Sequence, residues 1–332
     1  MKPQIDVEAP EPGEADTTSP AQQQSGEPRV PQVTPDLPPA TWRAILRLLR
    51  RLPQGALSRG FGRIADVRIP GPLRRPVLGA VARALRIDLS EAEQPLEAYA
   101  SVNELFVRRL REGIRSWPED PIAVGSPVDG VVGRLGVIHD GLLVQAKGRW
   151  YSVADLLADP AEAERFDGGA YLTLYLSPRH YHRIHAPCAG GIAQARHVPG
   201  ALLPVNAPAV AHIPDLFARN ERVVCTIDGP LGRVALVAVG AYNVGRISTA
   251  FDPEWCAVPG RVRSVSNRRV APEPVRRYSP PVPVERGEEI MAFHLGSTVI
   301  LLFEPGPARL DLERLRPGAE IRLGTQIVSA AQ

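Results

Sequence analysis

A serine, two histidines and an aspartate in this 332-residue chain could together attack a peptide bond. Asp129 lies in the motif Pro-Val-Asp-Gly, His182 and His185 lie in the segment YLSPRHYHRIHAP, and Ser297 lies in Leu-Gly-Ser-Thr. An internal serine can attack the peptide bond before it when a base takes its proton and a carboxylate orients that base. Gly296 leaves room for the tight turn that this attack needs. His185 is therefore the candidate base, and Asp129 is the candidate orienting carboxylate.

Each of these residues also has an ordinary structural interpretation. An Asp-Gly pair is usually a turn, and a serine in Gly-Ser-Thr is usually a turn residue. The spacing of His180, His182 and His185 is compatible with a metal site, because residues two apart on a strand point the same way. No nearby pattern of cysteine or glutamate completes four ligands, so no metal is predicted. The ordered combination of motifs, rather than any single residue, favours catalysis.

Short β-branched runs separated by glycine and proline begin near Ile122. They predict strands over 131–138, 142–145, 171–176, 222–227, 233–239 and 299–303, with Asp228-Gly229 as a hairpin turn. Strands and helices do not alternate regularly, which argues against a doubly wound parallel sheet. The expected fold class is α+β and β-rich. It comprises two packed, largely antiparallel sheets in a sandwich-like arrangement, with amphipathic helices at the N-terminal end.

Charge and proline are unevenly distributed in the first third of the chain, although the net charge is only +3. Residues 1–40 contain seven acids, two bases and nine prolines, which predicts a disordered tail. Residues 41–90 contain eleven arginines, no lysine and two acids. Within them, residues 42–52 predict a helix with one apolar face and one arginine face. Such a helix either lies on an anionic bilayer or packs on its own domain.

These patterns divide the chain into three parts: a tail over 1–40, a basic helical, membrane-associating region over 41–115, and a catalytic β-rich domain over 116–332. Ser101-Val102-Asn103-Glu104 is a capping box that predicts a helix to about Arg111. No run approaches the ~18 apolar residues of a transmembrane helix, and the N-terminus lacks the apolar segment of a secretory signal. The expected membrane association is therefore peripheral.

Four motifs in the same order resemble those of the bacterial phosphatidylserine decarboxylase proenzymes. They are Pro-Val-Asp-Gly at 127–130, YLSPRHYHRIHAP at 175–187, LFARNERVV at 216–224 and Leu-Gly-Ser-Thr at 295–298. The resemblance covers roughly residues 96–306. It implies that the chain cuts itself between Gly296 and Ser297, with Asp129 and His185 as the partners of Ser297. The products would be a β chain of residues 1–296 and an α chain of residues 297–332.

The resemblance also implies the reaction. Ser297 becomes a covalent pyruvoyl group, which forms a Schiff base with phosphatidylserine, releases CO2 and gives phosphatidylethanolamine. His182 is the candidate acid that protonates the carbanion. The implied partners are the substrate, an anionic phospholipid membrane at the cytoplasmic face, and the α and β chains in a heterodimer that could itself form a homodimer. His180 stands where the family commonly has an acid, which changes the local charge of the loop.

Two other functions are compatible with parts of the sequence. The turns at Pro127–Val132 and Arg286–Glu288 resemble those of barrel-sandwich carrier or phosphotransfer modules, although no lysine sits on a hairpin tip near them. The arginine-rich region could bind nucleic acid, but it lacks interleaved aromatics and any recognition motif, so no nucleic-acid partner is predicted. Lys147, His197, His294 and the cluster Asn220-Glu221-Arg222 are weaker site candidates, with structural roles favoured.

Overall fold

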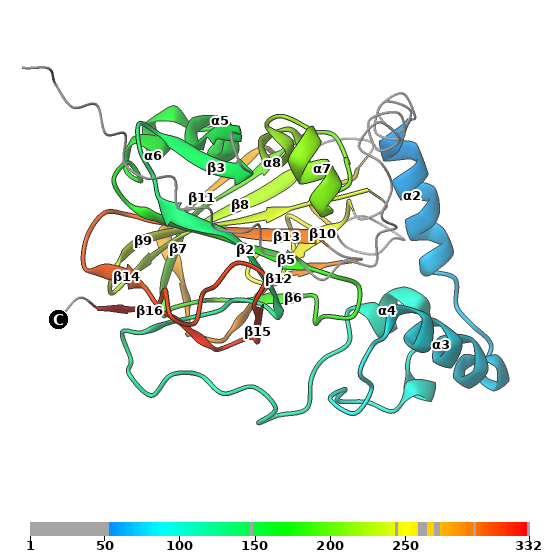
Figure 1. The fold of residues 1–332 in the computed structure, drawn as a ribbon. Coiled ribbons are helices and arrows are strands. Elements are labelled where there is room, and N and C mark those ends of the chain that lie inside the picture. The colour runs from blue at the N-terminus through cyan, green and yellow to red at the C-terminus, as the bar shows by residue number, and fades with distance from the viewer. Residues whose placement is uncertain are drawn as a thin grey trace, which may run out of the picture.

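An eight-stranded antiparallel sheet is the largest element of the fold (Figure 1). The computed structural model describes residues 53–146, 149–242, 245–257, 264–268, 273–294 and 297–330. In spatial order the strands of this sheet are β11 (Val275–Val284), β7 (Gly190–Val198), β8 (Arg222–Gly229), β9 (Gly232–Val239), β13 (Ser297–Phe303), β5 (Ala170–Leu176), β2 (Gly130–Val137) and β15 (Glu320–Ile321). The inner strand β13 pairs with β5 on one side and with β9 on the other.

One face of the large sheet packs against two smaller sheets. These are β1 (Val124–Gly125), β16 (Gln326–Ala330) and β14 (Ala308–Leu310), and β10 (Ile247–Thr249), β12 (Glu289–Phe293) and β6 (Arg183–His185). The other face packs against a hairpin and four short helices: β3 (Leu142–Ala146), β4 (Arg149–Ser152), α5 (Val153–Leu157), α6 (Pro160–Glu164), α7 (Ala207–His212) and α8 (Leu216–Arg219). The central strands of the large sheet are therefore buried on both faces.

The apolar sequence of β13 follows from this position. Val299, Leu301 and Phe303 enter the core on the side of the small sheets, whereas Ile300 and Leu302 enter the core beneath the helices. Successive side chains of a strand point to opposite faces, so a strand buried on both faces needs a continuous apolar run.

The N-terminal helices lie together at one end of the molecule (Figure 1). They are α2 (Gln54–Ala65), α3 (Gly71–Leu85), the 3₁₀ turn η1 (Leu96–Ala98) and α4 (Val102–Phe106). Leu105 of α4 packs in one cluster with Leu78 of α3, and Phe106 packs against Ala65 of α2. The short helix α4 thus joins α2 and α3 to the β-rich body.

The predicted fold class is confirmed, since the chain is β-rich with antiparallel sheets and N-terminal helices. Each of the six predicted strands forms, with ends shifted by one or two residues. The hairpin of β8 and β9 also forms, but its turn lies one residue pair beyond the predicted one. Gly229 pairs with Gly232, so Pro230 and Leu231 make the turn.

The helix predicted from the capping box forms and begins where predicted, but it is shorter than predicted. The Ser101 side chain accepts from the Glu104 N–H at 3.1 Å, and Glu104 accepts from the Ala100 N–H at 2.7 Å. The helix stops at Phe106 rather than near Arg111. The reason is tertiary pairing: the chain over 109–111 runs extended and hydrogen-bonds to residues 91–93.

Two other predictions fall on residues 1–52, the tail and the helix over 42–52, and they lie outside the described residues. In the part of the chain that the structure describes, no helix combines the length and the apolar character needed to cross a bilayer.

The connection between β12 and β13 links two different sheets. β12 is the middle strand of the small sheet with β10 and β6, and β13 is an inner strand of the large sheet. The predicted cut between Gly296 and Ser297 falls in this connection, immediately before β13. The predicted scissile bond therefore lies in a connection that runs from one sheet to another.

Candidate active site

Strand register brings the predicted residues to one end of the large sheet. Val131 of β2 pairs with Tyr175 of β5, and Tyr175 pairs with Thr298 of β13. Because these strands alternate in direction, the start of β2, the end of β5 and the start of β13 lie at the same end of the sheet. Asp129 directly precedes β2, and Ser297 begins β13. Neighbouring strands lie about 4.8 Å apart, so the backbones of Asp129 and Ser297 are separated by roughly 10 Å.

The histidine segment closes the same end of the sheet. It connects β5 to β6, and the His185 N–H donates to the Pro127 carbonyl at 2.9 Å. The Phe293 N–H, at the end of β12, donates to the His182 carbonyl at 2.9 Å. The segment is therefore tied both to the Pro-Val-Asp-Gly motif and to the strand before the predicted cut.

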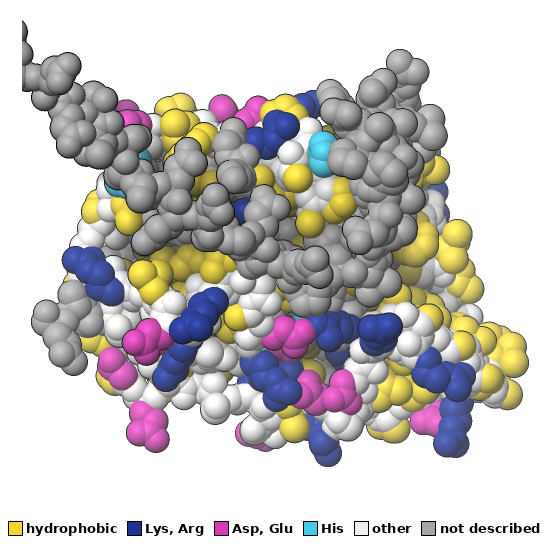
Figure 2. All heavy atoms as spheres, viewed as in Figure 1, with side chains coloured by type: hydrophobic (Ala, Val, Ile, Leu, Met, Phe, Trp, Pro, Cys, Tyr) yellow, Lys and Arg dark blue, Asp and Glu magenta, His cyan; other side chains and the backbone are white. Residues whose placement is uncertain are grey.

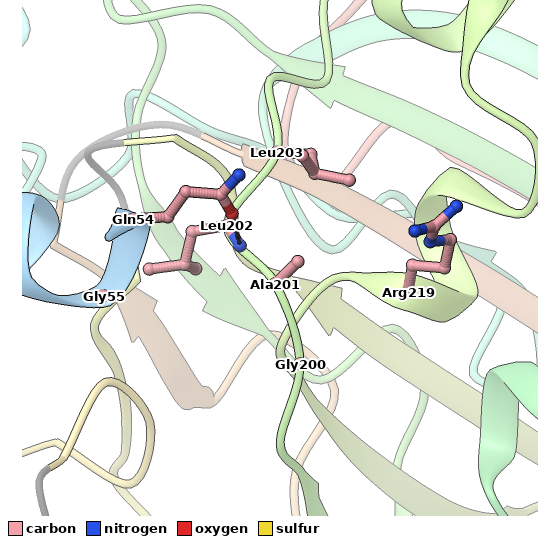
Figure 3. A pocket seen from close by; sticks show the side chains of 7 residues that line it. All are labelled: Gln54, Gly55, Gly200, Ala201, Leu202, Leu203 and Arg219. Carbon is pink, nitrogen blue, oxygen red and sulfur yellow. Dashed lines mark hydrogen bonds between the residues drawn. The ribbon is translucent and has the colours of Figure 1, made fainter. Parts of the chain in front are cut away.

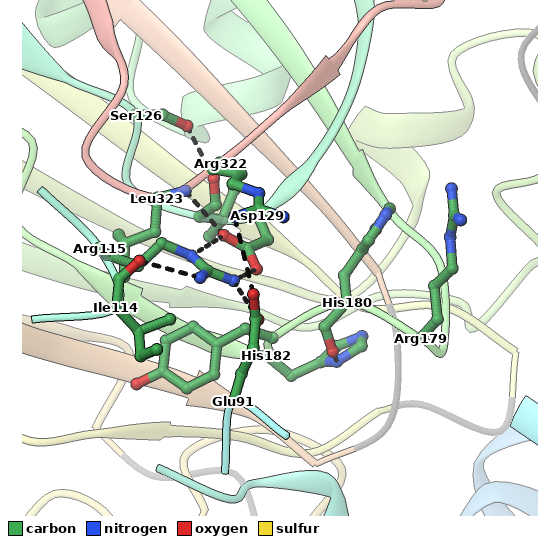
Figure 4. Close-up of polar contacts among 12 residues, drawn as sticks. Glu91, Ile114, Arg115, Ser126, Asp129, Arg179, His180, His182, Arg322 and Leu323 are labelled. Atoms are coloured by element: carbon green, nitrogen blue, oxygen red, sulfur yellow. Dashed lines mark hydrogen bonds and ion pairs between the residues drawn. The ribbon is translucent and has the colours of Figure 1, made fainter. Parts of the chain in front are cut away.

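Asp129 is held by a two-pronged ion pair (Figure 4). Arg115 donates from Nε to Oδ1 at 3.0 Å and from Nη2 to Oδ2 at 2.6 Å. The Leu323 N–H also donates to Oδ1, at 2.7 Å, and Arg115 Nη2 donates to Glu91 at 2.7 Å. A planar guanidinium fits a carboxylate in this way and fixes its orientation. Asp129 therefore keeps a fixed position and a compensated charge inside the protein.

His185 is arranged as a base. Its Nδ1 lies 2.7 Å from the Gly287 carbonyl, which can only accept, so Nδ1 carries the proton. The unprotonated Nε2 then accepts from the Tyr181 hydroxyl at 3.0 Å. Burial lowers the pKa of His185, which favours the neutral ring at pH 7. The lone pair on Nε2 is available for a proton once the tyrosine hydroxyl gives way.

His182 is fully buried and carries a free lone pair. Its Nδ1 donates to the His180 carbonyl at 2.8 Å, and its Nε2 has no hydrogen-bond partner among the described residues. The ring packs on Phe106 with centroids 4.1 Å apart. Burial is the main reason why the pKa of His182 is well below the usual value, and the nearby His180 and Arg108 lower it further. An unpartnered buried nitrogen is rare in native proteins and is typical of a functional position.

The chain on the N-terminal side of the predicted cut is held by His294. Its Nδ1 donates to the Asn103 amide oxygen at 3.2 Å, and its Nε2 accepts from the Ser248 hydroxyl at 3.1 Å. Its backbone N–H donates to the Arg246 carbonyl at 3.0 Å. Residues 295–296 and the side chain of Ser297 lie outside the described part, whereas the Ser297 backbone pairs with Leu176.

The predicted residues therefore gather at one end of the sheet, although no hydrogen bond joins Asp129 to His185. The Gly287 carbonyl takes the position on His185 Nδ1 that a triad gives to its carboxylate, and Asp129 acts on His185 through its charge alone. The triad role of Asp129 stays a prediction. Spacing in the sequence does not predict the roles of Arg115 and Gly287, which reach Asp129 and His185 through tertiary contacts. Tyr181 lies only four residues before His185, within the histidine segment itself.

The weaker candidates have structural roles where the structure describes them. Asn220 bonds to the backbone of Leu203 and Gly240, and Glu221 bonds to His197 and to the Asn267 N–H. Lys147 lies outside the described residues. Among the described residues, no group of three or more His, Cys, Asp or Glu side chains is placed to hold a metal ion.

A surface pocket lies elsewhere, between the start of α2, the loop that connects β7 to α7, and the end of α8 (Figure 3). It is lined by Gln54, Gly55, Gly200, Ala201, Leu202, Leu203 and Arg219, a set that includes none of the predicted site residues. The Leu202 N–H donates to the Gln54 side chain at 2.9 Å across it. This pocket is thus a feature of the helix–body junction.

Comparison with known proteins agrees with the resemblance drawn from the motifs. The family model for phosphatidylserine decarboxylase matches residues 102–329. The chain belongs to the phosphatidylserine decarboxylase family. A phosphatidylserine decarboxylase proenzyme from Anaeromyxobacter sp. (strain K) is 47% identical over 87% of this chain and 99% of its own length. The proenzyme from Myxococcus xanthus (strain DK1622) is 40% identical over 85% of this chain and 96% of its own length.

A third proenzyme of the family, from Bordetella petrii, is 43% identical over 77% of this chain and 87% of its own length. The family match spans Asp129, the histidine segment and Ser297, and it begins at the first residue of α4. Helices α2 and α3 lie before the match to the family model, while the longer matches to whole proenzymes reach beyond it.

Two histidines with lowered pKa values predict a loss of stability in acid. Burial lowers the pKa of His180 to about 4 and of His294 to about 3, with nearby arginines contributing. An unfolded histidine titrates near 6.5, so between about pH 6.5 and these values the unfolded chain binds protons that the folded chain does not. Each such histidine should lower the free energy of unfolding by about 1.4 kcal/mol per pH unit as the pH falls through this window.

Urea unfolding of the wild type and of His294→Asn at pH 7, 6 and 5 measures this slope. The variant should lose stability less steeply, by about one proton, and His139→Asn should match the wild type because His139 is exposed. Equal slopes for His294→Asn and the wild type would show that His294 does not stay neutral in the folded chain.

Proposed function

We propose that this protein is a self-processing phosphatidylserine decarboxylase that cuts itself between Gly296 and Ser297. The observation that carries the proposal is the register that sets the start of β13 beside the Asp129 and histidine segments, in a chain of this family. Hydroxyl attack at the bond before Ser297 needs a neutral base nearby, and His185 has the required tautomer and a lowered pKa.

The two products of the cut would remain one protein. Ser297–Gln332 is a 36-residue chain (332 − 296) that begins with β13. Seven residues of β13 pair with β5, and six pair with β9. A strand that is hydrogen-bonded on both sides and buried on both faces would lose all of these contacts if it left the sheet. The cut therefore frees the N-terminal residue of β13, while the strand itself stays paired in the sheet.

Asp129 supports processing through its charge. It lies near His185, and its carboxylate favours the protonated form of that ring. When His185 takes the proton of the serine hydroxyl, this charge stabilises the imidazolium that forms. The two-pronged ion pair with Arg115 holds the Asp129 carboxylate in place.

The described residues around Ser297 fit a pyruvoyl group formed from it. The fit rests on His182, whose buried Nε2 is an orphaned acceptor at the end of the sheet where β13 begins. The pyruvoyl group supplies an electron sink for the electrons left by departing CO2. His182 Nε2 can take a proton from the substrate ammonium and return it to carbon afterwards, which makes it the proton carrier of the reaction.

The outer face of α2 and α3 supports a peripheral position on an anionic membrane, at the cytoplasmic face. Hydrophobic side chains gather over the end of the molecule formed by these helices (Figure 2). On α2 the exposed apolar residues follow a helical spacing, with Leu57, Phe61 and Ile64 on one face. Arginines accompany them at positions 59, 63, 68, 74 and 75. Apolar side chains flanked by arginines are typical of a surface that inserts shallowly into anionic lipid.

The rival carrier module is not favoured. The turn at Arg286–Glu288 is used internally, since the Gly287 carbonyl holds His185 and Arg286 donates to the carbonyls of Pro118, Asp120 and Ala123. The family match also runs through the whole β-rich body rather than one small barrel.

Intact mass spectrometry of freshly purified protein tests the cut. The wild type should give a chain of residues 1–296 and a chain of residues 297–332 that is lighter by one ammonia than a serine-started peptide. Ser297→Ala should stay a single inactive chain, because it lacks the attacking hydroxyl. Ser329→Ala, a serine in β16, is the control and should cut normally. A full-length wild type that still decarboxylates would overturn the mechanism.

His182→Ala should separate processing from turnover. The variant should run as two chains on a gel, while CO2 release falls by roughly 10²–10⁴-fold, the usual contribution of a positioned proton donor. His139→Ala changes an exposed histidine and is the matched control, which should be cut and should release CO2 like the wild type. An uncut His182→Ala chain would instead place His182 in the processing machinery.

Phe61→Asp/Ile64→Asp should weaken binding to anionic vesicles. Phe61 is 45% exposed and Ile64 is 71% exposed on the outer face of α2, so both changes spare the core. Losing two apolar contacts and adding two negative charges should reduce binding by roughly tenfold or more in co-sedimentation. Leu312→Asp alters a residue that is 67% exposed outside α2 and α3 and should bind like the wild type. Unchanged binding of the double variant would move the membrane contact elsewhere.

A further inference from the structure

Two arginines are buried among the described residues, Arg108 and Arg222, and their surroundings differ sharply. Arg222 is fully bonded: Nε, Nη1 and Nη2 donate to four backbone carbonyls, those of Asp155, Leu156, Ala218 and Asn220. It closes the ends of α5 and α8. This residue shows what a purely structural buried guanidinium looks like in this fold.

Arg108 is 3% exposed and is nearly without partners. Its one hydrogen bond runs from Nη2 to the Arg179 carbonyl at 3.4 Å, and Nε and Nη1 have no partner among the described residues. It makes no ion pair with any described carboxylate within 4 Å, unlike Arg115. A buried, unpaired charge is strongly unfavourable, so such a group is expected to meet an anion when the protein works.

Arg108 lies in the neighbourhood of the proton carrier. It acts electrostatically on both His180 and His182, and its hydrogen bond goes to the residue before His180. Phe106, two residues earlier, packs on the His182 ring. Two orphaned donors on Arg108 and one orphaned acceptor on His182 therefore occur in the same buried part of the site.

We propose that Arg108 binds the phosphodiester of the phospholipid head group. This rests on the proposed function, which supplies a substrate with two oxyanions, a phosphodiester and a carboxylate. A guanidinium donates only, and its fork matches either oxyanion. Pairing with the carboxylate would stabilise the very charge that must leave as CO2, and would slow the reaction. The phosphodiester keeps its charge from substrate to product, so a permanent cation can hold it throughout.

The packing of α4 gives the head group a short path from the membrane. Phe106 contacts Ala65 on the inner side of α2, and the outer side of α2 carries the exposed Phe61 and Ile64. Phe106 also contacts His182. The proposed membrane surface, α4 and the reaction site are thus consecutive layers, and Arg108 follows α4 directly.

Calorimetric titration of the processed protein with glycerophosphoethanolamine, ethanolamine and L-serine tests the proposal. Glycerophosphoethanolamine carries an amine and a phosphodiester, whereas ethanolamine carries the amine alone. Arg108→Gln should weaken binding of the first roughly 10- to 100-fold, the usual effect of losing hydrogen bonds to a charged group, and leave the second unchanged. Arg108→Lys should lie between. Arg109→Gln is the matched control, since the Arg109 side chain is 61% exposed and pairs weakly with Glu289.

Two outcomes of the titration would overturn the proposal. Equal affinity of Arg108→Gln and the wild type for glycerophosphoethanolamine would show that the residue does not bind phosphate. Weaker binding of L-serine but not of glycerophosphoethanolamine would assign Arg108 to the carboxylate. The mass spectrum and CO2 release of the wild type test the proposed function. The Arg108 variants test this inference, so the two failures can be told apart.

A second measurement covers a purely structural role. If Arg108 is kept for an anion, Arg108→Met should raise the urea midpoint of the ligand-free protein, because a buried unpaired charge is replaced by an apolar chain. Arg222→Met should lower it, because four carbonyls lose their donors. A lower midpoint for Arg108→Met would show that the fold itself needs the charge, and would overturn the proposal.

Discussion

The antiparallel pairing of β13 between β5 and β9 is the constraint on which the rest of the site depends. It fixes the position of the Ser297 backbone at one end of the sheet. Through the pairing of β5 with β2, it also fixes Asp129 at the same end of the sheet. Because the side-chain period of a strand is two, a slip of one residue would exchange the two cores that Val299 and Ile300 enter. Apolar burial on both faces thus sets the position of a polar reaction site at the strand end.

The same pairing reconciles self-cutting with stability. A chain that breaks its own backbone must not lose the part beyond the break. The proposed cut lies between two sheets, and the strand after it is an inner strand whose residues 298–303 are buried. The strand before it, β12, stays in its own sheet with β10 and β6, and His294 is bonded through both ring nitrogens. Each end of the break has independent support.

Polar groups at the site fall into two kinds. Asp129 and Arg115 are mutually satisfied and hold position, as a fully bonded buried pair does. His182 and Arg108 each leave nitrogens without partners in the described residues. In a protein interior, unsatisfied groups reduce stability and persist where function requires them. The contrast distinguishes the groups that hold the site in place from those that we propose to contact the substrate.

Much of the fold could be predicted because it depends on local patterns. Alternating β-branched runs marked the strands, and Gly130 was visible as part of its motif. Its structural reason is the backbone oxygen of Tyr175, which would lie 2.9 Å from any Cβ there. The early end of α4 could not be predicted, because it comes from pairing with residues 91–93. The bond between His185 and the Gly287 carbonyl likewise comes from a tertiary contact, whereas Tyr181 lies four residues before His185 in the same segment.

In the proposed mechanism the substrate reacts at the start of β13. Reductive trapping tests it most directly: the processed protein is incubated with phosphatidylserine and cyanoborohydride, denatured, and both chains are weighed by mass spectrometry. We predict that the 36-residue chain beginning at Ser297 gains the mass of the trapped amine less one oxygen atom, and that the larger chain gains nothing. Label on the larger chain, or CO2 release with neither chain labelled, would contradict it.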